Sequence, residues 1–193
     1  MKIAIAGSHG LIGTNLVTHF RKSNINVTRI VRLKDQNGIY WDPLTGYINH
    51  ENLENYDAII NLCGEKIASF NPFFKNKNKL ISSRVSTNLI LSKTIAKLVN
   101  PPKYFITASA TGIYKPTKRR ITESGKLNTG FLAQLALEWE EASKFYDNGK
   151  TKIINLRLGQ VISPKSFYFK ALSNITKYMK ISSFGNGKQR WPW

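Results

Sequence analysis

The chain of 193 residues has the length of a single domain, and its 41% hydrophobic residues are enough to fill a core. One cysteine excludes an internal disulfide and a Cys-x-x-Cys metal site, and three scattered histidines form no ligand cluster, so no metal site is predicted. No stretch has the length of a membrane span or a secretory leader, so we expect a protein of the reducing cytoplasm without a membrane partner.

The net charge of +18 comes from 29 Lys and Arg against 11 Asp and Glu. Such an excess favours polyanions, and the basic clusters at 74–80 and 115–120 are candidate anion patches. However, the lysines are spread along the chain among many Asn and Ile residues, as expected from the compositional bias of an AT-rich genome. A basic nucleic-acid-binding protein is therefore only the third hypothesis for this chain.

Short apolar runs alternate along the chain with segments whose apolar residues recur every three to four positions. Runs that are apolar throughout are typical of strands in a parallel sheet covered on both faces. The alternation predicts an α/β fold, a Rossmann-type doubly wound parallel sheet with helices on both faces. The expected strands are 2–6, 26–31, 58–62, 104–108 and 152–158, and the expected helices are 11–23, 78–99 and 131–149.

The first strand leads into the glycine pattern G-x-x-G-x-x-G, within the stretch IAIAGSHGLIGT at 3–14. Gly7 would allow a tight turn, Gly10 would let the backbone approach a pyrophosphate, and Gly13 would let the helix pack against the strand. A structural turn is the alternative, but the strand and helix on either side are the context that dinucleotide binding requires. The predicted cofactor-binding residues here are Gly7, Ser8, His9, Gly10, Leu11, Ile12 and Gly13.

The end of the second strand, VTRIVRLKD, contains two arginines where NAD-binding proteins carry an acidic residue. Arg32 would lie beside the adenosine ribose, with Arg29 in the same neighbourhood, and a guanidinium there suits a 2′-phosphate. NADP is therefore the predicted cofactor. Asp35 keeps NAD possible, and a surface cation is the alternative for Arg32.

At this point the chain resembles the atypical extended short-chain dehydrogenase/reductases known as the epimerase family, which are relatives of sugar-nucleotide epimerases. The resemblance spans the whole chain, and it identifies the family without indicating the substrate. Besides the glycine pattern, the similar segments are YWDPLTGYI (40–48), DAIINLCGEKIA (57–68), SSRVSTNLI (82–90), PPKYFITASATGIY (101–114), LRLGQVISP (156–164) and GNGKQRWPW (185–193).

The resemblance implies roles for further residues. It places Asn61, Leu62, Cys63 and Gly64 along the adenine and ribose side of the cofactor, where Cys63 is expected to be a small buried apolar group. It places Arg157 near the nicotinamide.

The same family likeness assigns Ser109 to the serine that binds a substrate oxygen in catalytic relatives, and Tyr114 to a tyrosine shortly after it. These two residues are the predicted catalytic pair, and a tyrosine packed over the cofactor cleft is the alternative for Tyr114. It also matches Arg84 and Thr87 to helix positions that are more often structural.

The tyrosine and lysine four residues apart that active relatives use are missing from the expected helix, where Phe131 and Leu135 stand instead. The same spacing occurs at 114–118, where Pro116 prevents a helix, and at 146–150, which contains an Asn-Gly helix stop. Whether the chain is an enzyme therefore stays open on sequence grounds.

Family members continue past the tryptophan matched by Trp193 into a segment that closes the substrate pocket, so we expect a truncated chain. An NAD(P)-binding domain at 1–165 would be followed by an incomplete substrate-side segment at 166–193. The first hypothesis is an NADP-dependent oxidoreductase or epimerase-like enzyme acting on a small carbonyl, hydroxyl or nucleotide-sugar substrate. The second is a catalytically silent nucleotide-binding module or remnant, because a pocket open to water cannot desolvate reacting groups.

Overall fold

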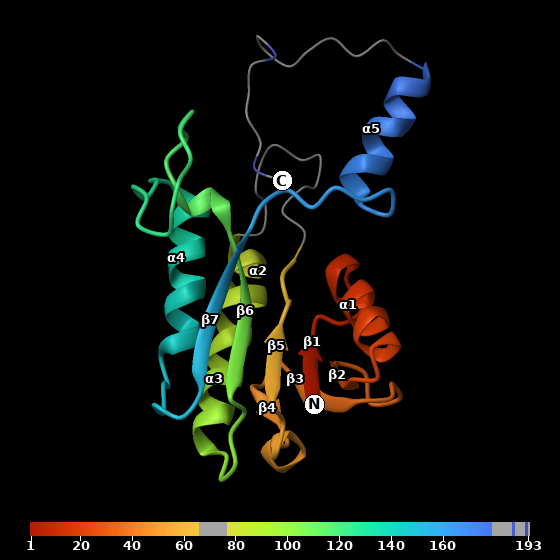
Figure 1. The fold of residues 1–193 in the computed structure, drawn as a ribbon, viewed down its shortest axis with the longest axis vertical. Helices are drawn as coiled ribbons and strands as arrows, with labels where there is room; N and C mark the ends of the chain where they lie inside the picture. Colours follow the sequence, from red (N-terminus) through yellow and green to blue (C-terminus); the bar gives the residue numbers. More distant parts are fainter. Residues whose placement is uncertain (66–76, 179–186, 188–191, 193) are drawn as a thin grey trace.

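The computed structural model describes residues 1–65, 77–178, 187 and 192. Its centre is a seven-stranded sheet in the order β4-β3-β2-β1-β5-β6-β7, in which only the β3–β4 pair is antiparallel (Figure 1). The predicted doubly wound parallel sheet is confirmed. The strands are β1 (Lys2–Ala6), β2 (Asn26–Val31), β3 (Ile39–Asp42), β4 (Tyr47–Ile48), β5 (Ala58–Asn61), β6 (Tyr104–Ala110) and β7 (Lys152–Leu158).

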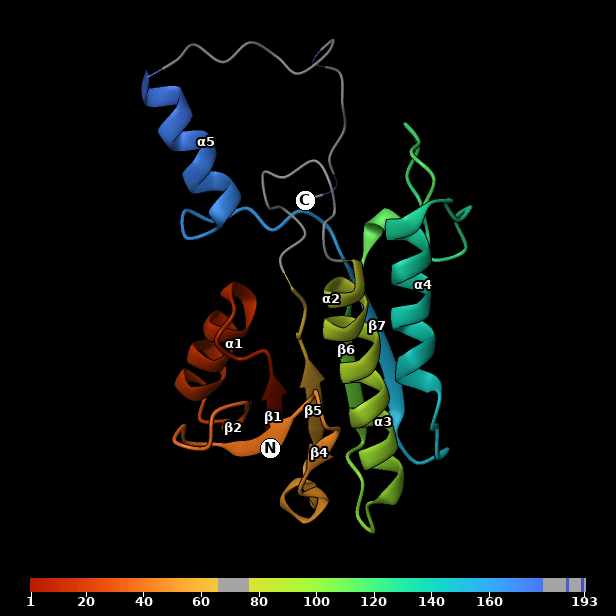
Figure 2. The ribbon, with the colours of Figure 1, turned by 180° about the vertical axis from the view of Figure 1, so that it is seen from behind.

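Helices lie on both faces of the sheet, except the last helix, which lies beyond the carboxyl ends of the strands (Figure 1). They are α1 (Leu11–Lys22), α2 (Lys77–Ile81), α3 (Thr87–Lys97), α4 (Phe131–Lys144) and α5 (Phe167–Tyr178), with short 3₁₀ turns at His50–Leu53 and Thr111–Ile113. Seen from opposite sides, α3 and α4 cover one face and α1 covers part of the other (Figures 1 and 2). The helix predicted over 78–99 is confirmed as continuous helical backbone over 77–97, in which a π-helical turn at Ser82–Ser86 joins α2 to α3.

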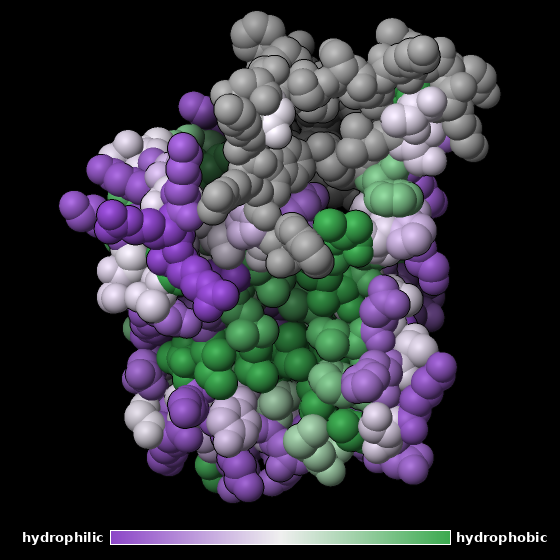
Figure 3. Space-filling model, turned by 45° about the horizontal axis from the view of Figure 1, so that its top comes forward, coloured by the Kyte–Doolittle hydropathy of each residue, from purple (hydrophilic) through white to green (hydrophobic). Residues whose placement is uncertain are grey.

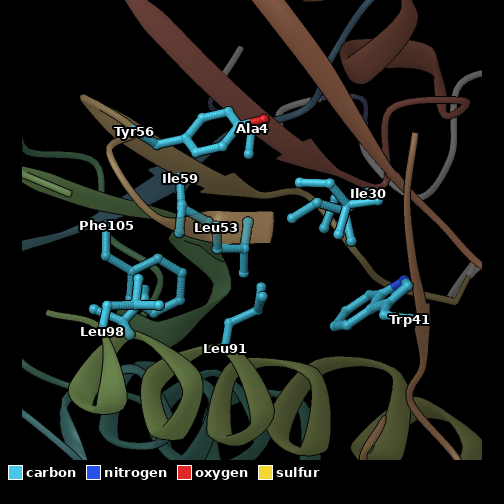
Figure 4. Packing of buried hydrophobic residues seen from close by; sticks show 12 residues of the cluster. Ala4, Ile30, Trp41, Leu53, Tyr56, Ile59, Leu91, Leu98 and Phe105 are labelled. Atoms are coloured by element: carbon cyan, nitrogen blue, oxygen red, sulfur yellow. The ribbon is translucent and has the colours of Figure 1, made fainter. Parts of the chain in front are cut away.

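The buried apolar residues form two clusters, one on each face of the sheet. On the side of α3, Leu91 packs with residues of the strands such as Ile59 and Phe105 (Figure 4). On the side of α1, Val17 packs with Ile3, Ile5, Val27, Ala58 and Ile60. Because alternate residues of β1 and β5 enter opposite clusters, both strands are apolar except for Lys2 at the start of β1 and Asn61 at the end of β5.

The β3–β4 hairpin was not predicted as strands from the sequence. It is formed by residues 39–48, where the Asp42 carboxylate accepts the Leu44 N–H at 2.9 Å and Gly46 adopts a φ of +75°. Trp41 of β3 is 1% exposed and belongs to the α3-side cluster. The predicted domain boundary at 165 falls between β7 and α5, and the division itself stays a prediction.

Candidate functional site

The parallel strands β1, β5, β6 and β7 end at the same edge of the sheet. Ala6 of β1 pairs with Asn61 of β5, and Ser109 of β6 pairs with Arg157 of β7. Neighbouring strands lie about 4.8 Å apart, so the turn after β1 and the end of β6 are separated by about 10 Å. An extended dinucleotide spans such a distance, and open α/β sheets bind ligands along this edge.

The turn after β1 is built around glycines that no other residue could replace without movement. Gly7 has a φ of +73°, and a Cβ on it would lie 2.6 Å from the Leu62 carbonyl carbon. A Cβ on Gly13 would lie 2.4 Å from the Gly7 carbonyl oxygen, so α1 packs directly on the turn. These positions match the tight turn and the helix packing predicted for the two residues.

Gly10 leaves the start of α1 open. Gly10 is the N-cap residue of α1 and has no side chain that could cap the helix. The first turn of α1 contains no acidic residue. The exposed N–H groups and partial positive charge of such a helix end attract anions. His9 is exposed beside Gly10, while Leu11 and Ile12 are half-buried in the first turn.

A second feature of the turn points to a ligand. The Ser8 hydroxyl is buried, with 1% of the residue exposed, and has no hydrogen-bond partner among the described residues. The Ser8 carbonyl accepts from Arg29 Nη1 at 2.6 Å, so Arg29 fastens the turn to β2. Buried hydroxyls usually have a partner, and the residues of this turn therefore fit a phosphate group.

Arg32 is exposed just beyond the end of β2. Burial raises the pKa of the Cys63 thiol to about 12, and the positive charge of Arg32 partly opposes that rise. Arg32 is therefore close to the chain after β5. The placement of Arg32 beside the adenosine ribose stays a prediction.

The thiol of Cys63 packs against the α3-side core cluster, as the sequence indicated. Because its pKa is raised from 9.0 to about 12, the thiolate fraction near neutral pH falls by about a thousandfold. We therefore expect iodoacetamide to alkylate the folded chain much more slowly than the same chain in urea. Mass spectrometry over time measures both rates, and equal rates would contradict the burial of Cys63.

Asn61 ends β5 with its side chain completely buried. Its amide nitrogen donates to Asn88 Oδ1 at 2.7 Å, and its Oδ1 accepts the Cys63 N–H at 3.0 Å. Asn88 in turn donates to the Trp139 carbonyl oxygen at 2.8 Å, which links β5 to α3 and α4. The Asn61 side chain has no surface left for a ligand, so it can act on a nucleotide only through the backbone that it holds.

Arg84 holds the next part of the same loop. It is 7% exposed within the π turn, donates to the Glu65 carbonyl oxygen at 2.8 Å, and lies over the Trp139 ring at 5.2 Å. A Cβ on Gly64 would lie 3.3 Å from the Arg84 guanidinium. Arg84 is thus a structural residue, as the sequence indicated, and Gly64 permits its close approach.

Four polar side chains form a connected cluster at the ends of β6 and β7. The Ser109 hydroxyl donates to Glu140 Oε1 at 2.6 Å. Arg157 donates to both oxygens of Glu140, from Nε and Nη2 at 2.8 Å each, and its Nη1 donates to the Tyr114 hydroxyl oxygen. The Arg157 guanidinium also lies 5.0 Å from the centre of the Tyr114 ring. We call these residues the Ser-Glu-Arg-Tyr cluster.

The electrostatics of this cluster favour its charged form. Burial by itself would raise the pKa of Glu140, but hydrogen bonds from Arg157 and Ser109 outweigh burial and lower it below the ordinary value. The hydrogen bonds to Glu140 raise the pKa of Arg157 above its ordinary value. Because Arg157 can only donate, the Tyr114 oxygen accepts, and the Tyr114 hydroxyl proton stays available for another acceptor.

Sequence reasoning found three members of this cluster and missed Glu140. Ser109 and Tyr114 were predicted to be catalytic, and Arg157 was predicted to lie near the nicotinamide. Ser109 is 3% exposed and directs its proton to Glu140, so its hydroxyl links β6 to α4. The sequence did contain a sign of Glu140. It lies three to four residues from Ala136 and Ser143, on the buried face of α4, and a buried carboxylate requires a partner.

Neither Tyr-x-x-x-Lys copy lies on a helix. Tyr114 forms an isolated bridge with Leu127, and Lys118 follows in an exposed loop. Tyr146 and Lys150 both lie beyond the end of α4. On α4 itself, Leu135 is 3% exposed. The two positions of α4 where active relatives carry the pair hold Phe131 and Leu135 in this chain.

Other candidate ligand sites are weaker. A groove of about 740 Å³ lies between α3, α4 and the β3–β4 turn, and none of the predicted site residues lines it. Across the described residues, no His, Cys, Asp and Glu group could hold a metal ion, and no helix is long and apolar enough to cross a membrane. The basic cluster 115–120 is exposed, whereas 74–80 falls partly outside the described residues.

Comparison with known proteins agrees with this architecture. The family model for the NAD dependent epimerase/dehydratase family matches residues 3–193. An epimerase family protein of Mycobacterium leprae is 32% identical over 194 residues, which are 99% of this chain and 62% of the relative. An epimerase family protein of Mycobacterium tuberculosis is 34% identical over 194 residues, which are 99% of this chain and 64% of the relative. The chain thus spans less than two thirds of these relatives.

Solved structures share the fold. The nucleoside-diphosphate sugar epimerase of Corynebacterium glutamicum superimposes with a TM-score of 0.85 at 24% identity, covering 100% of this chain and 40% of that one. A human epimerase family protein crystallised with NADPH also has a TM-score of 0.85, at 25% identity, covering 100% of this chain and 65% of that one.

Proposed function

The chain belongs to the NAD dependent epimerase/dehydratase family, and from that premise we propose that it binds NADPH in preference to NADH at the Gly7–Gly13 turn. The observation that carries the proposal is the uncapped start of α1 beside the unpartnered buried Ser8 hydroxyl. The human relative was crystallised with NADPH, which supports the same cofactor here. The proposal includes an epimerase-like or oxidoreductase role on a small carbonyl, hydroxyl or nucleotide-sugar substrate.

Different residues would bind the different chemical groups of the cofactor. The N–H groups that follow Gly10 and the Ser8 hydroxyl would bind the pyrophosphate, and Arg32 would bind the 2′-phosphate with charge-assisted hydrogen bonds. The Cys63 and Gly64 backbone, held by Asn61 and Arg84, would form the wall on the adenine and ribose side. When bound, the nicotinamide supplies a site that accepts or donates hydride.

The proposal is tested by titrating the chain with NADPH and NADH, following tryptophan fluorescence. In Gly10→Asp, the new carboxylate can cap α1, but the added Cβ would lie 3.3 Å from the Gly7 carbonyl oxygen, so stability should change by no more than about 1 kcal/mol. The same carboxylate repels the pyrophosphate, so affinity should fall by about a hundredfold. Thr18→Asp, an exposed change later in α1, is the matched control and should bind normally. Folded wild-type chain that binds neither nucleotide would overturn the proposal.

Arg32→Ala tests the choice of nucleotide in the same assay. Loss of hydrogen bonds from a guanidinium to a phosphate should weaken NADPH by at least about tenfold and leave NADH unchanged. Lys34→Ala removes another exposed cation nearby and should change neither affinity. Equal losses of NADPH affinity in the two variants would mean that Arg32 contributes only general electrostatic attraction and does not select the 2′-phosphate.

The chemistry would rest on Tyr114. Arg157 donates to its oxygen and Glu140 holds Arg157 from the other side, so the phenol can pass its proton to a substrate oxygen while a fixed cation faces the negative charge left behind. In this arrangement Arg157 would serve where active relatives use the lysine of the helical pair. Ser109 would position Glu140 from β6.

Tyr114→Phe separates an enzyme from the second candidate, a silent nucleotide-binding module. That candidate is favoured by the commitment of the Ser109 hydroxyl to Glu140 and by the missing helical pair. For an enzyme, Tyr114→Phe should keep NADPH affinity and lower turnover by about a hundredfold or more, measured by nicotinamide absorbance with a panel of carbonyl and nucleotide-sugar substrates. Tight binding without turnover in the wild type would establish the silent module.

A further inference from the structure

A groove of about 650 Å³ lies at the amino ends of β6 and β7. The turn from α4 to β7 forms part of it, at the end of the sheet opposite to α5 (Figure 1). The space-filling view shows hydrophilic side chains at the lower left, where the apolar surface of the sheet ends (Figure 3). We call this groove the lysine groove, because its lining includes four exposed lysines, Lys103, Lys144, Lys150 and Lys152.

Hydrogen bonds hold the backbone that carries these lysines. In the turn, Asn148 Oδ1 accepts the N–H groups of Lys150 at 2.9 Å and Thr151 at 3.1 Å. The buried Thr151 hydroxyl donates to the Pro102 carbonyl oxygen at 2.8 Å, which fastens the turn to the segment before β6. On that segment, the Lys103 carbonyl oxygen accepts the first N–H of β7 at 2.9 Å. The fold therefore fixes where the lysines stand.

Little negative charge balances the cations of the lysine groove. Of the four lysines, Lys144 alone has an ion-pair partner within the described part of the chain, and this pair with Glu141 is exposed and weak. Asp147 is the one acidic residue among the described lining residues, and its Oδ1 accepts the Gly149 N–H at 3.0 Å. Like charges held close together repel each other, so a bound anion would stabilise this arrangement.

An aromatic ring lies beside the lysines. Tyr104 lines the groove, is 43% exposed, and pairs with Lys152 across β6 and β7. Exposed rings in basic surroundings stack on nucleobases. The volume of the groove is within the range of about 300 to 1,000 Å³ that is usual for small-molecule sites. The groove thus offers partners for phosphates and for a base.

The surface beyond the lysine groove carries charges of both signs. The Asp57 carbonyl oxygen accepts the Tyr104 N–H at 3.2 Å, and the Asp57 carboxylate accepts the Lys2 N–H at 2.7 Å. Three residues earlier, the Glu54 carboxylate accepts the Val99 N–H at 2.9 Å. A long polyanion that continued toward β5 would meet these carboxylates. The confined positive charge favours a small ligand over a nucleic-acid strand.

We propose that the lysine groove binds a small molecule in which a nucleobase is joined to a di- or triphosphate. The ammonium groups would bind the phosphate oxygens, and the Tyr104 ring would stack on the base. The groove lies at the opposite ends of the strands from the Gly7–Gly13 turn. The proposed site is therefore separate from the proposed cofactor site, and it does not depend on cofactor binding or turnover.

The test is isothermal titration calorimetry of the 193-residue chain with ATP, which is used here as the probe. Saturating NADPH is present to occupy the Gly7–Gly13 turn, and a second titration uses Gly10→Asp without NADPH, so that the result does not rely on cofactor binding. We expect one ATP per chain in both titrations. Raising NaCl from 50 to 500 mM should weaken ATP by at least about tenfold, because salt screens exposed charges.

Two variants test the residues of the groove. Lys150→Glu combined with Lys152→Glu should weaken ATP by at least about tenfold, because each change replaces an attraction by a repulsion. Lys22→Glu combined with Lys165→Glu makes the same charge change at exposed positions elsewhere and should leave the affinity within about twofold. Tyr104→Leu should weaken ATP by about fivefold or more and leave inorganic triphosphate unchanged, because stacking involves the base alone.

Four results would overturn the proposal. The first is no ATP binding in either titration while circular dichroism shows folded protein. The second is an equal loss in the two double variants, which would attribute binding to the net charge of +18. The third is an unchanged ATP affinity in Tyr104→Leu. The fourth is a single-stranded oligonucleotide that binds more tightly than ATP and is lost in Lys150→Glu/Lys152→Glu, which would assign the groove to nucleic acid.

Discussion

Glu140→Ala is expected to lower the free energy of unfolding by about 3 kcal/mol. The change leaves the Arg157 guanidinium without its bidentate partner and Ser109 without its acceptor. Removing one partner of a buried ion pair costs about 3 to 5 kcal/mol, and the lower end applies because the Arg157 side chain is 23% exposed and water can reach it. Urea unfolding followed by circular dichroism measures the difference.

The neighbouring Glu141 provides the control. It pairs with Lys144 at 3.5 Å, but the two side chains are 73% and 51% exposed, so Glu141→Ala should cost less than about 1 kcal/mol. The same α4 backbone thus carries a buried and a surface carboxylate side by side. Equal effects of the two variants would mean that the Glu140–Arg157 pair contributes no more than a surface ion pair.

The effect of Glu140 should depend on pH in a definite direction. The pKa of Glu140 is lowered in the folded chain, so its stabilising contribution is complete above the unfolded value of about 4.3. That contribution is lost as the pH falls through the lowered folded pKa. The stability gap between wild type and Glu140→Ala should therefore be constant near neutral pH and narrow in acid.

The parts of the fold that could be predicted are those whose signal is local. The strand at 58–62 is apolar except for Asn61 because it is buried on both faces, and the glycines at 7–13 have a fixed spacing between a strand and a helix. The β3–β4 hairpin has strands of only four and two residues, too short for a periodic pattern. The π turn contains Arg84, whose contacts with Glu65 and Trp139 come from distant parts of the chain.

The candidate site also has one part that could be predicted from local sequence and one part that could not. The turn at Gly7 could be predicted because a strand, a turn and a helix follow one another directly. The Ser-Glu-Arg-Tyr cluster could be predicted only in part, because Glu140 is 31 residues from Ser109 and 17 from Arg157. The pairing of β6 with β7 and the packing of α4 bring these residues together. The family resemblance supplied the other three residues, but it carried no information about this carboxylate.

Gly13→Ala should destabilise the chain by about 3 kcal/mol and weaken NADPH binding together with it. The new methyl group would lie 2.4 Å from the Gly7 carbonyl oxygen and 2.7 Å from the Ser8 Cα. Both contacts are backbone atoms that cannot rotate away, so α1 must shift off the turn. Gly13 is helical with an ordinary backbone conformation, and alanine would otherwise favour the helix by about 1 kcal/mol.

The balance between these two effects makes Gly13→Ala a sensitive test of the turn geometry. Gly112→Ala is the control, since a Cβ there meets nothing within 4 Å, and its stability should change by less than about 1 kcal/mol. Thermal unfolding and NADPH titration of both variants give the comparison. If Gly13→Ala is as stable as the wild type, α1 does not pack on the Gly7–Ser8 backbone.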